Sequence, residues 1–472
     1  MITWRGVPTG RVMRVRTLAA FVSTLLGAAC ESNTSDSAIT PMVKASQTET
    51  LQPPSMLRTI DDDFAALAEE VPGFGGMYFD TDGVLTIQLV NPEALAFARP
   101  KVVALLERGI RWGPGRTNQR AAVAREMRTV RARFDYRQLV SLYRTEVVPL
   151  MGTTEGITMT DIDERQNRIV VGVKDASTLA AIREHFANPR IPSNAVEVLL
   201  FNLPAAETVS RSAKTTTASL SMVNQSLQGD LRPAIPGGAR IAVNYQNSIY
   251  TGTLGFNLMP WINGTPGTTR YLVTCSHCAW PLNQMQGVGV GQPTWSGQLA
   301  VEIVDPPAFP GVVGGWCPSQ KICRWSEAAL ARYDDSTLAD QGMIALPAIG
   351  SITFSSRVPI AVMDVPYVGQ PVHMIGSQSG RRFGNVAQSC ANVAHPQNSL
   401  LIMLCQARAT YTSMTGDSGS PIIALYGNGT AGGIGIHWGS NGWFSILYQA
   451  LDELYGASGG AYGVMDPVVP AP

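Results

Sequence analysis

The most informative part of this 472-residue chain is Thr415-Gly416-Asp417-Ser418-Gly419-Ser420-Pro421. It follows a polar run and precedes an apolar strand predicted at residues 422–426. Glycines on both sides of Ser418 allow a sharp turn that leaves the serine hydroxyl exposed. The same turn can direct the backbone N–H groups of Gly416 and Ser418 at one point, where two donors stabilise an oxyanion. The pattern therefore predicts a nucleophilic serine with its own oxyanion hole.

A serine becomes a nucleophile only beside a base, and the chain has five histidines. His277 follows an apolar strand predicted at residues 271–275, in the motif Thr274-Cys275-Ser276-His277-Cys278. Together with Gly-Asp-Ser-Gly-Ser-Pro downstream, this motif resembles the trypsin/chymotrypsin-like serine peptidases. The resemblance covers about residues 240–455 and is greatest to the bacterial branch that includes streptogrisins and alpha-lytic protease.

The resemblance implies a mainly β fold, the trypsin-like double β-barrel, with His277 as general base and Ser418 as nucleophile. Short strands near residues 241–245 and 252–258, separated by turns rich in Gly and Pro, suit such barrels. The N–H groups of Gly416 and Ser418 would form the oxyanion hole. No cofactor is expected for this chemistry.

Two positions compete for the acid that orients the base. The sequence Glu327-Ala328-Ala329-Leu330 matches the family's Asp-x-Ala-Leu pattern with Glu in place of Asp, and Asp340 fits a looser bacterial pattern. We expect Glu327 first, Asp340 as the alternative, and Asp334 or Asp335 behind them. Because Glu is one methylene longer than Asp, its carboxylate reaches the imidazole only if the backbone retreats by about one C–C bond.

Residues 435–440, Gly-Ile-His-Trp-Gly-Ser, resemble the strand that forms one wall of the family's primary specificity pocket. The substrate-binding candidates are Thr412, His437, Trp438 and Gly439. The predicted pocket base at 411–413 has no carboxylate to hold Arg or Lys. We expect cleavage after a small or apolar residue, or after Glu, since glutamyl endopeptidases of this fold have a His in a similar setting.

In some family members an Arg pairs with the Asp before the nucleophile, but Met374 stands in that place here. Asp417 must therefore have another partner, and Arg381, Arg382 or a newly freed amine are the candidates.

Six of the seven cysteines lie in the peptidase-like region. Their order favours two disulfides that each close a local loop, Cys317–Cys323 and Cys390–Cys405. Cys275 and Cys278 either pair with each other or stay reduced. With His277 they also suggest zinc, but no second ligand pair stands elsewhere, so we expect no metal.

Residues 1–30 are predicted to be an export signal, because basic residues precede an apolar run at 18–29 that is too short for a permanent membrane span. Cys30 fits the lipidated cysteine of a bacterial lipoprotein signal, and ordinary cleavage near Ala29 is the alternative. We therefore expect an exported protein, either secreted or anchored by lipid in a bacterial envelope.

The expected order of segments is a signal peptide at 1–30, a flexible tether at 31–58, an α/β domain at 59–202, a linker at 203–238, the peptidase domain at 239–460 and a tail at 461–472. The α/β domain contains two predicted hairpins, at 74–87 and 157–173, and a long basic stretch with helical spacing at 116–150. Its strand-turn-strand-helix order resembles the pro-regions of streptogrisin-type peptidases, which assist the folding of the peptidase and inhibit it.

A net charge of zero argues against nucleic acid as a partner. We therefore expect an exported serine endopeptidase that cleaves protein or peptide substrates through an acyl-enzyme and is held as a zymogen by its own N-terminal region. The alternative is a catalytically impaired barrel that binds rather than cuts.

Overall fold

The structure is a computed structural model that describes residues 58–108, 126–192, 194–203, 210–211, 225–246, 248–279, 282–295 and 297–468. All of these belong to one compact unit, Gln52–Pro472. The predicted signal, Cys30 and all but the last residue of the predicted tether lie outside the described residues. Within the described ranges, no helix has the length and apolar character that a membrane crossing needs.

The N-terminal lobe, residues 58–203, repeats one topology: an antiparallel hairpin, a helix, and a third strand parallel to the second. The first repeat consists of β1 (Phe74–Phe79), β2 (Leu85–Leu89), α2 (Leu95–Arg108) and β3 (Met127–Arg131). The second consists of β4 (Ile157–Asp163), β5 (Arg168–Val173), α6 (Ala176–Phe186) and β6 (Val196–Leu200). Both predicted hairpins are therefore present, one in each copy of the repeated unit.

The remaining helices of this lobe pack beside the repeats. They are α1 (Ile60–Glu70), α4 (Tyr136–Leu142) and α5 (Val148–Thr153), with a π-helical turn between the last two. The helical spacing predicted across 116–150 is wrong at Val130, which lies in β3, and residues 116–125 lie outside the described ranges. Pairing of β3 with β2 overrides the local pattern, and the helix begins only after Asp135, whose side chain caps it.

The first barrel is built from the strands β12 (Phe256–Ile262), β14 (Tyr271–Cys275), β19 (Ala328–Tyr333), β16 (Ala300–Val304), β15 (Gly289–Gly291), β10 (Arg240–Tyr245) and β11 (Ser248–Thr253), in that spatial order. The single strand predicted at 252–258 is the end of β11 and the start of β12. The chain bends at Gly255, where a Cβ atom would lie 2.8 Å from the carbonyl oxygen of Val273.

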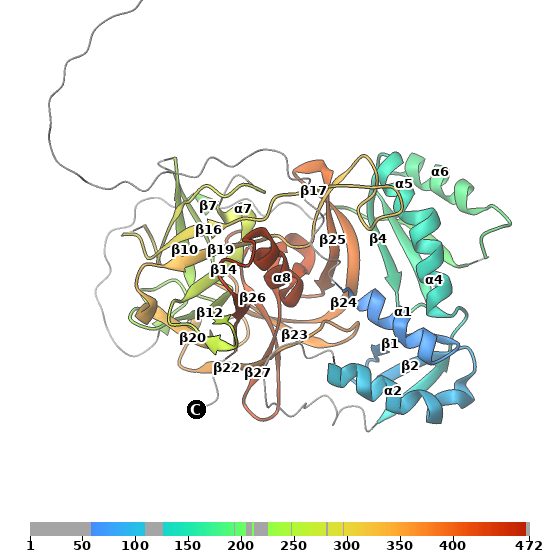
Figure 1. Cartoon of the computed structure of the whole chain (residues 1–472), viewed down its shortest axis with the longest axis horizontal. Helices are drawn as coiled ribbons and strands as arrows, with labels where there is room; N and C mark the ends of the chain where they lie inside the picture. Colours follow the sequence, from blue (N-terminus) through green and yellow to red (C-terminus); the bar gives the residue numbers. More distant parts are fainter. Residues whose placement is uncertain are drawn as a thin grey trace, which may run out of the picture. The chain divides into compact units, whose positions relative to one another are not determined.

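The second barrel follows the order β25 (Asn398–Ala409), β28 (Trp443–Ile446), β27 (Ala431–Gly439), β26 (Pro421–Leu425), β23 (Pro371–Gly376) and β24 (Gly380–His395). Because β24 pairs again with β25, the sheet closes on itself. Two further strands, β20 (Ala339–Ala345) and β22 (Arg357–Met363), extend it through β27. The architecture is thus the expected mainly β, trypsin-like double barrel, preceded by a smaller α/β lobe (Figure 1).

Strands also join the barrels to segments on either side. In the N-terminal lobe, β4 pairs with β24, so one sheet runs from the lobe into the second barrel (Figure 1). Within the predicted linker, β8 (Gln225–Ser226) and β9 (Ile235–Gly237) pair with β21 (Thr353–Phe354) and β20. Within the predicted tail, β29 (Val464–Asp466) pairs with β12.

Candidate active site

His277 lies at the end of a buried strand of the first barrel. Strand β14 ends at Cys275, and the single helical turn α7 (Ser276–Ala279) follows it. The antiparallel register of β14 with β19 places Cys275 opposite Ala328. The residue before Ala328 is Glu327, so two neighbouring strands bring the histidine and the acid together.

The carboxylate of Glu327 holds His277 in two ways. Its Oε1 atom lies 2.8 Å from Nδ1 of the ring and accepts a second hydrogen bond, of 3.1 Å, from the main-chain N–H. Glu327 is fully buried, and the side chain of His277 is only 6% exposed. Burial opposes ionisation of this carboxyl, but the charge and hydrogen bond of His277, together with smaller effects of His395 and Arg324, outweigh it, so the pKa of Glu327 is lowered.

The structure does not bring Asp340 to His277. Its carboxylate is paired with Arg357, 2.9 Å away, and its backbone carbonyl accepts a bond from Asn257. The remaining acids are also engaged at other places: Asp334 accepts from Gln298, and Asp335 caps a short 3-10 turn. Among the four sequence candidates for the orienting acid, Glu327 is the one in contact with the histidine.

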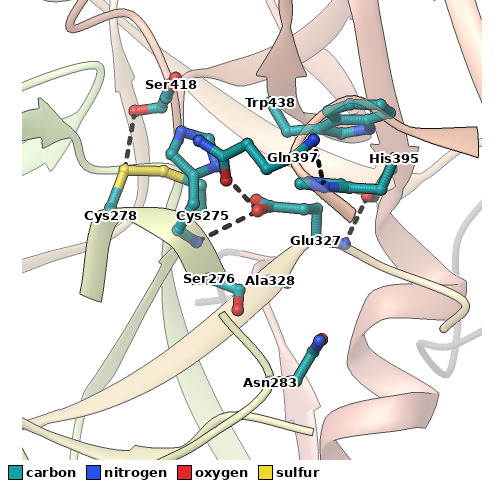
Figure 2. Close-up of polar contacts among 12 residues, drawn as sticks. Cys275, Ser276, Cys278, Asn283, Glu327, Ala328, His395, Gln397, Ser418 and Trp438 are labelled. Carbon is teal, nitrogen blue, oxygen red and sulfur yellow. Dashed lines mark hydrogen bonds and ion pairs between the residues drawn. A yellow bond between two sulfur atoms is a disulfide. The ribbon is translucent and has the colours of Figure 1, made fainter. Parts of the chain in front are cut away.

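Ser418 lies in a turn between β25 and β26. The neighbouring Gly416 and Gly419 have φ values of +97° and +91°, which side chains rarely tolerate. The Ser418 carbonyl accepts a 2.9 Å bond from the N–H of Thr253, and Sγ of Cys278 lies 3.6 Å from the same oxygen (Figure 2). The serine segment of the second barrel therefore packs against the α7 turn that carries His277.

The partner of Asp417 is the backbone. One carboxylate oxygen accepts from the N–H groups of Gln378, at 2.9 Å, and Ser379, at 3.0 Å, and the other accepts from Met414, at 2.8 Å. A Cβ atom on Gly376 would lie 2.2 Å from this carboxylate. Peptide donors therefore stand where a cation from Arg381, Arg382 or a newly freed amine was expected, and Arg381 bonds His373 instead.

The residues of the predicted pocket wall run antiparallel to the serine turn. The N–H of Gly419 donates to the carbonyl of His437, at 2.7 Å, and the N–H of His437 donates to Ser420, at 2.9 Å. The fully buried ring of His437 places Nδ1 3.1 Å from the hydroxyl of Tyr411. His437 is thus tied to the serine turn by its backbone and to the predicted pocket base by its ring.

The other predicted pocket residues differ in exposure. Thr412 is exposed, whereas Gly439 is buried and pairs with β28. Trp438 is 2% exposed, and its ring stacks on His395 with a centroid separation of 6.0 Å (Figure 2). Burial, against an opposing effect of Glu327, lowers the pKa of His395 to about 4. At neutral pH, His395 is therefore an uncharged ring beside the buried acid.

Arg324 holds the residues next to His277 and Glu327, and no local motif in the sequence indicated this role. This arginine is fully buried and makes an ion pair of 2.9 Å with Asp305. The Nη1 atom also donates to Oγ of Ser276, at 2.9 Å, and Nη2 donates to the carbonyl of Ala328, at 3.1 Å. The residues next to the base and next to the acid thus share one guanidinium.

A second support starts from Gln406. Its Nε2 donates to the carbonyl of Trp325, and its Oε1 accepts from Nε1 of Trp438 and Oγ of Ser445, all at 2.9 Å. Oγ of Ser445 in turn accepts from the N–H of Glu327, at 2.8 Å. One buried amide therefore connects the pocket wall with the strand of the acid.

Glu453, on the helix α8 (Leu447–Ala457), completes this support. It accepts from the N–H groups of Trp325 and Ser326, each at 2.8 Å, immediately before Glu327. Burial raises the pKa of Glu453, with Arg324 opposing.

Three disulfides lie in the barrels. Cys317–Cys323 and Cys390–Cys405 are bonded as predicted, and Cys275 is bonded to Cys278, which the sequence left open. The Cys275–Cys278 disulfide encloses His277 in a loop of four residues.

No protein-family model matches the sequence, and no curated protein matches it closely enough to count as a relative. Similar solved structures include protease A of Thermobifida fusca, with 17% identity and a TM-score of 0.32 over 46% of this chain and 94% of that protein. Nocardiopsis protease has 18% identity and a TM-score of 0.32 over 47% and 96%. Cellulomonas bogoriensis chymotrypsin has 19% identity and a TM-score of 0.31 over 47% and 96%. The roles of individual residues therefore rest on the contacts described above.

Proposed function

We propose that the protein is a serine endopeptidase in which His277 is the general base, Ser418 the nucleophile and Glu327 the orienting acid. The observation that carries the proposal is the buried 2.8 Å contact between Nδ1 of His277 and Oε1 of Glu327. A carboxylate on Nδ1 holds the proton there and leaves the lone pair of Nε2 for proton transfer. The serine turn packs against the same α7 turn, which supports its role.

The reaction proceeds through an acyl-enzyme. Nε2 of His277 takes the proton from Oγ of Ser418 as that oxygen attacks the carbonyl carbon of the peptide bond. The N–H groups of Gly416 and Ser418 donate to the oxyanion, and the protonated imidazole then gives its proton to the leaving amine. In the second half, Nε2 of His277 takes a proton from water as the water attacks the acyl carbon. The imidazolium then returns the proton to Oγ of Ser418, and the second product leaves. Glu327 stabilises the imidazolium while remaining ionised.

The substrate preference follows from the pocket wall around His437. The pocket base proposed at 411–413 has no carboxylate, so Arg and Lys have no counter-charge. We propose cleavage after a small or apolar side chain, with Glu as the second preference because the imidazole of His437, which contacts the hydroxyl of Tyr411, would be the partner of an acidic group there.

We also propose that the N-terminal lobe restrains the barrels until it is cut away, and that the protein acts after export. Met159 and Val170 of the lobe share one buried cluster with Trp438 and Trp443 of the second barrel. The ring of Phe201, just after β6, lies 6.2 Å from that of Trp443. These contacts involve Trp438 of β27, the strand of the proposed pocket wall, and therefore support a lobe that restricts access of substrate.

A fluorophosphonate, which reacts with activated serines, tests the proposal on the full chain before and after limited proteolysis. We expect stoichiometric modification of Ser418 after proteolysis, little before it, and none in His277→Ala. His373→Ala is the matched control, because that buried histidine bonds Arg381 and is no part of the proposed site. In Ser418→Ala, the segment between the lobe and the barrels should stay whole during purification.

The competing function is a silent barrel that only binds its partner. Unmodified Ser418 in the proteolysed chain, together with unchanged peptide substrate, would establish that alternative. Labelling that survives in His277→Ala would also contradict the assigned base.

A further inference from the structure

The disulfide at the histidine turn joins residues that could also ligate a metal ion. Among the described residues, the ligand atoms of Cys275, His277 and Cys278 lie within 4.8 Å of one another. Both cysteine side chains are fully buried, and His277 is 5% exposed. Two thiolates and one imidazole are ligands that zinc prefers, and with water as the fourth ligand they need no second ligand pair, which was the reason for expecting no metal from the sequence.

The hydrogen bond of Glu327 determines which ring atom of His277 is available. Since Nδ1 lies 2.8 Å from Oε1 of Glu327, a metal ion bound by this ring would be bound through Nε2. A carboxylate on the second ring nitrogen is also the usual support of a zinc-bound histidine, because it fixes the tautomer and raises the basicity of the ligand. Glu327 therefore prepares Nε2 equally for a proton and for a metal ion.

We propose that the Cys275–Cys278 disulfide closes a metal site: once a dithiol opens this bond, the two sulfurs and Nε2 of His277 bind Zn²⁺. Bound zinc occupies the lone pair that the base needs, so the zinc-loaded chain is inactive. This last consequence rests on the proposed function, whereas metal binding does not.

The redox step is a thiol–disulfide exchange. A dithiol donates two electrons and two protons, the S–S bond between Cys275 and Cys278 breaks to give two thiols, and the dithiol becomes a cyclic disulfide. Zinc then displaces one proton from each thiol, while Nε2 binds as a neutral ligand. Water supplies the fourth position of a tetrahedral site.

The surroundings of the sulfurs determine when this exchange occurs. Sγ of Cys278 lies 3.6 Å from the carbonyl of Ser418, and a Cβ atom on Gly252 would lie 2.8 Å from that sulfur. Because both sulfurs are buried between the barrels, exchange requires local opening of the α7 turn. We therefore expect the dithiol form in chain that is prepared in reductant, and slow reduction of the folded, oxidised chain.

Cobalt is a suitable probe, because Co²⁺ occupies zinc sites and cobalt–thiolate bonds absorb in the near ultraviolet. Full-length chain prepared in dithiol and transferred without oxygen to reductant-free buffer should bind one Co²⁺ with this absorption, and Zn²⁺ should abolish it. Oxidised chain should show none. Cys275→Ser/Cys278→Ser should lose the band, whereas Cys317→Ser/Cys323→Ser, which removes another disulfide, should keep it.

Glu327→Gln tests the role of the histidine with all thiols intact. We expect Co²⁺ affinity to fall roughly 10–100-fold, as for other losses of such a support. No cobalt–thiolate band in reduced wild type, or an undiminished band in Cys275→Ser/Cys278→Ser, would overturn the inference, as would unchanged affinity in Glu327→Gln. A metal-binding chain that never hydrolyses peptide would instead overturn only the proposed function.

Discussion

One oxygen of Glu327, Oε1, accepts hydrogen bonds from both the ring and the main chain of His277, at 2.8 and 3.1 Å. The ring and the backbone of the base are thus fixed by the same atom. A single carboxylate oxygen can accept both bonds because it has two lone pairs, and an ionised carboxylate carries no proton. The oxygen of an amide could accept the same two bonds, but a neutral amide stabilises an imidazolium poorly.

Glu327→Gln should therefore lower kcat about 10⁴-fold, the loss seen when a triad acid becomes an amide. Asp340→Asn should retain kcat within a few-fold, since Asp340 pairs with Arg357 away from the histidine. Both values can be measured on a peptide substrate above KM, at constant pH and after limited proteolysis. Equal losses in the two variants would contradict the assignment of Glu327.

Local motifs were enough to predict the barrels and to select the residues that we propose for the active site. A turn such as 415–421 carries its geometry in its own glycines, and a hairpin such as 157–173 carries it in alternation and a polar turn. The register of β14 with β19 then places Glu327 beside His277, as the family pattern implied. The disulfides Cys317–Cys323 and Cys390–Cys405 were predictable because each closes a short loop.

Supports that depend on distant parts of the chain could not be predicted. Gln406 bonds Trp325 across 81 positions, and Glu453 bonds it across 128. Nothing in the local sequence of either residue distinguishes a buried side chain with several hydrogen bonds from a surface residue. Asp417 was expected to need a cation, because sequence shows charges but does not show three backbone N–H groups converging on one carboxylate.

Arg324→Met should destabilise the protein by about 3–5 kcal/mol, because it leaves the buried carboxylate of Asp305 without its partner. Adding Asp305→Asn should recover part of this loss. The matched control is Arg357→Met, whose partly exposed pair with Asp340 is worth about 1 kcal/mol or less. Unfolding in urea gives these free energies, and a similar cost for both arginines would contradict the supporting role of Arg324.

Asp61 should make the stability of the chain depend on pH. Its buried carboxyl accepts a 2.6 Å bond from Tyr136, and burial raises its pKa from 3.8 to about 7, against the effect of that bond. Between these two values the folded chain binds more protons than the unfolded chain, so stability should fall as pH rises from about 4 to 7 and level off above.

Asp61→Asn should remove this part of the dependence. At about 1.4 kcal/mol per unit of pKa shift, the difference between wild type and variant should change by a few kcal/mol over the interval. Thermal melting of both chains from pH 4 to 8 provides the measurement. Asp161 and Glu164, whose pKa values are raised by burial and further by the charge of Asp61, remain in both chains, so the difference reports Asp61 together with its effect on these two neighbours. Parallel profiles would contradict a titrating Asp61.

Met159→Asp should release the proposed restraint by the N-terminal lobe. Met159 is fully buried in the cluster that contains Trp438 and Trp443, so an ionised carboxylate there has neither water nor a partner. The uncut variant should react with a fluorophosphonate at least roughly tenfold faster than wild type, since each 1.4 kcal/mol of weakened docking is a factor of ten. Leu200→Asp, at a residue 58% exposed in the same lobe, is the matched control and should leave the rate unchanged. Sensitivity of the lobe to proteolysis shows whether it is detached in Met159→Asp. If it is detached and both variants still react as slowly as wild type, the lobe does not block the serine. The cause of latency then lies within the barrels.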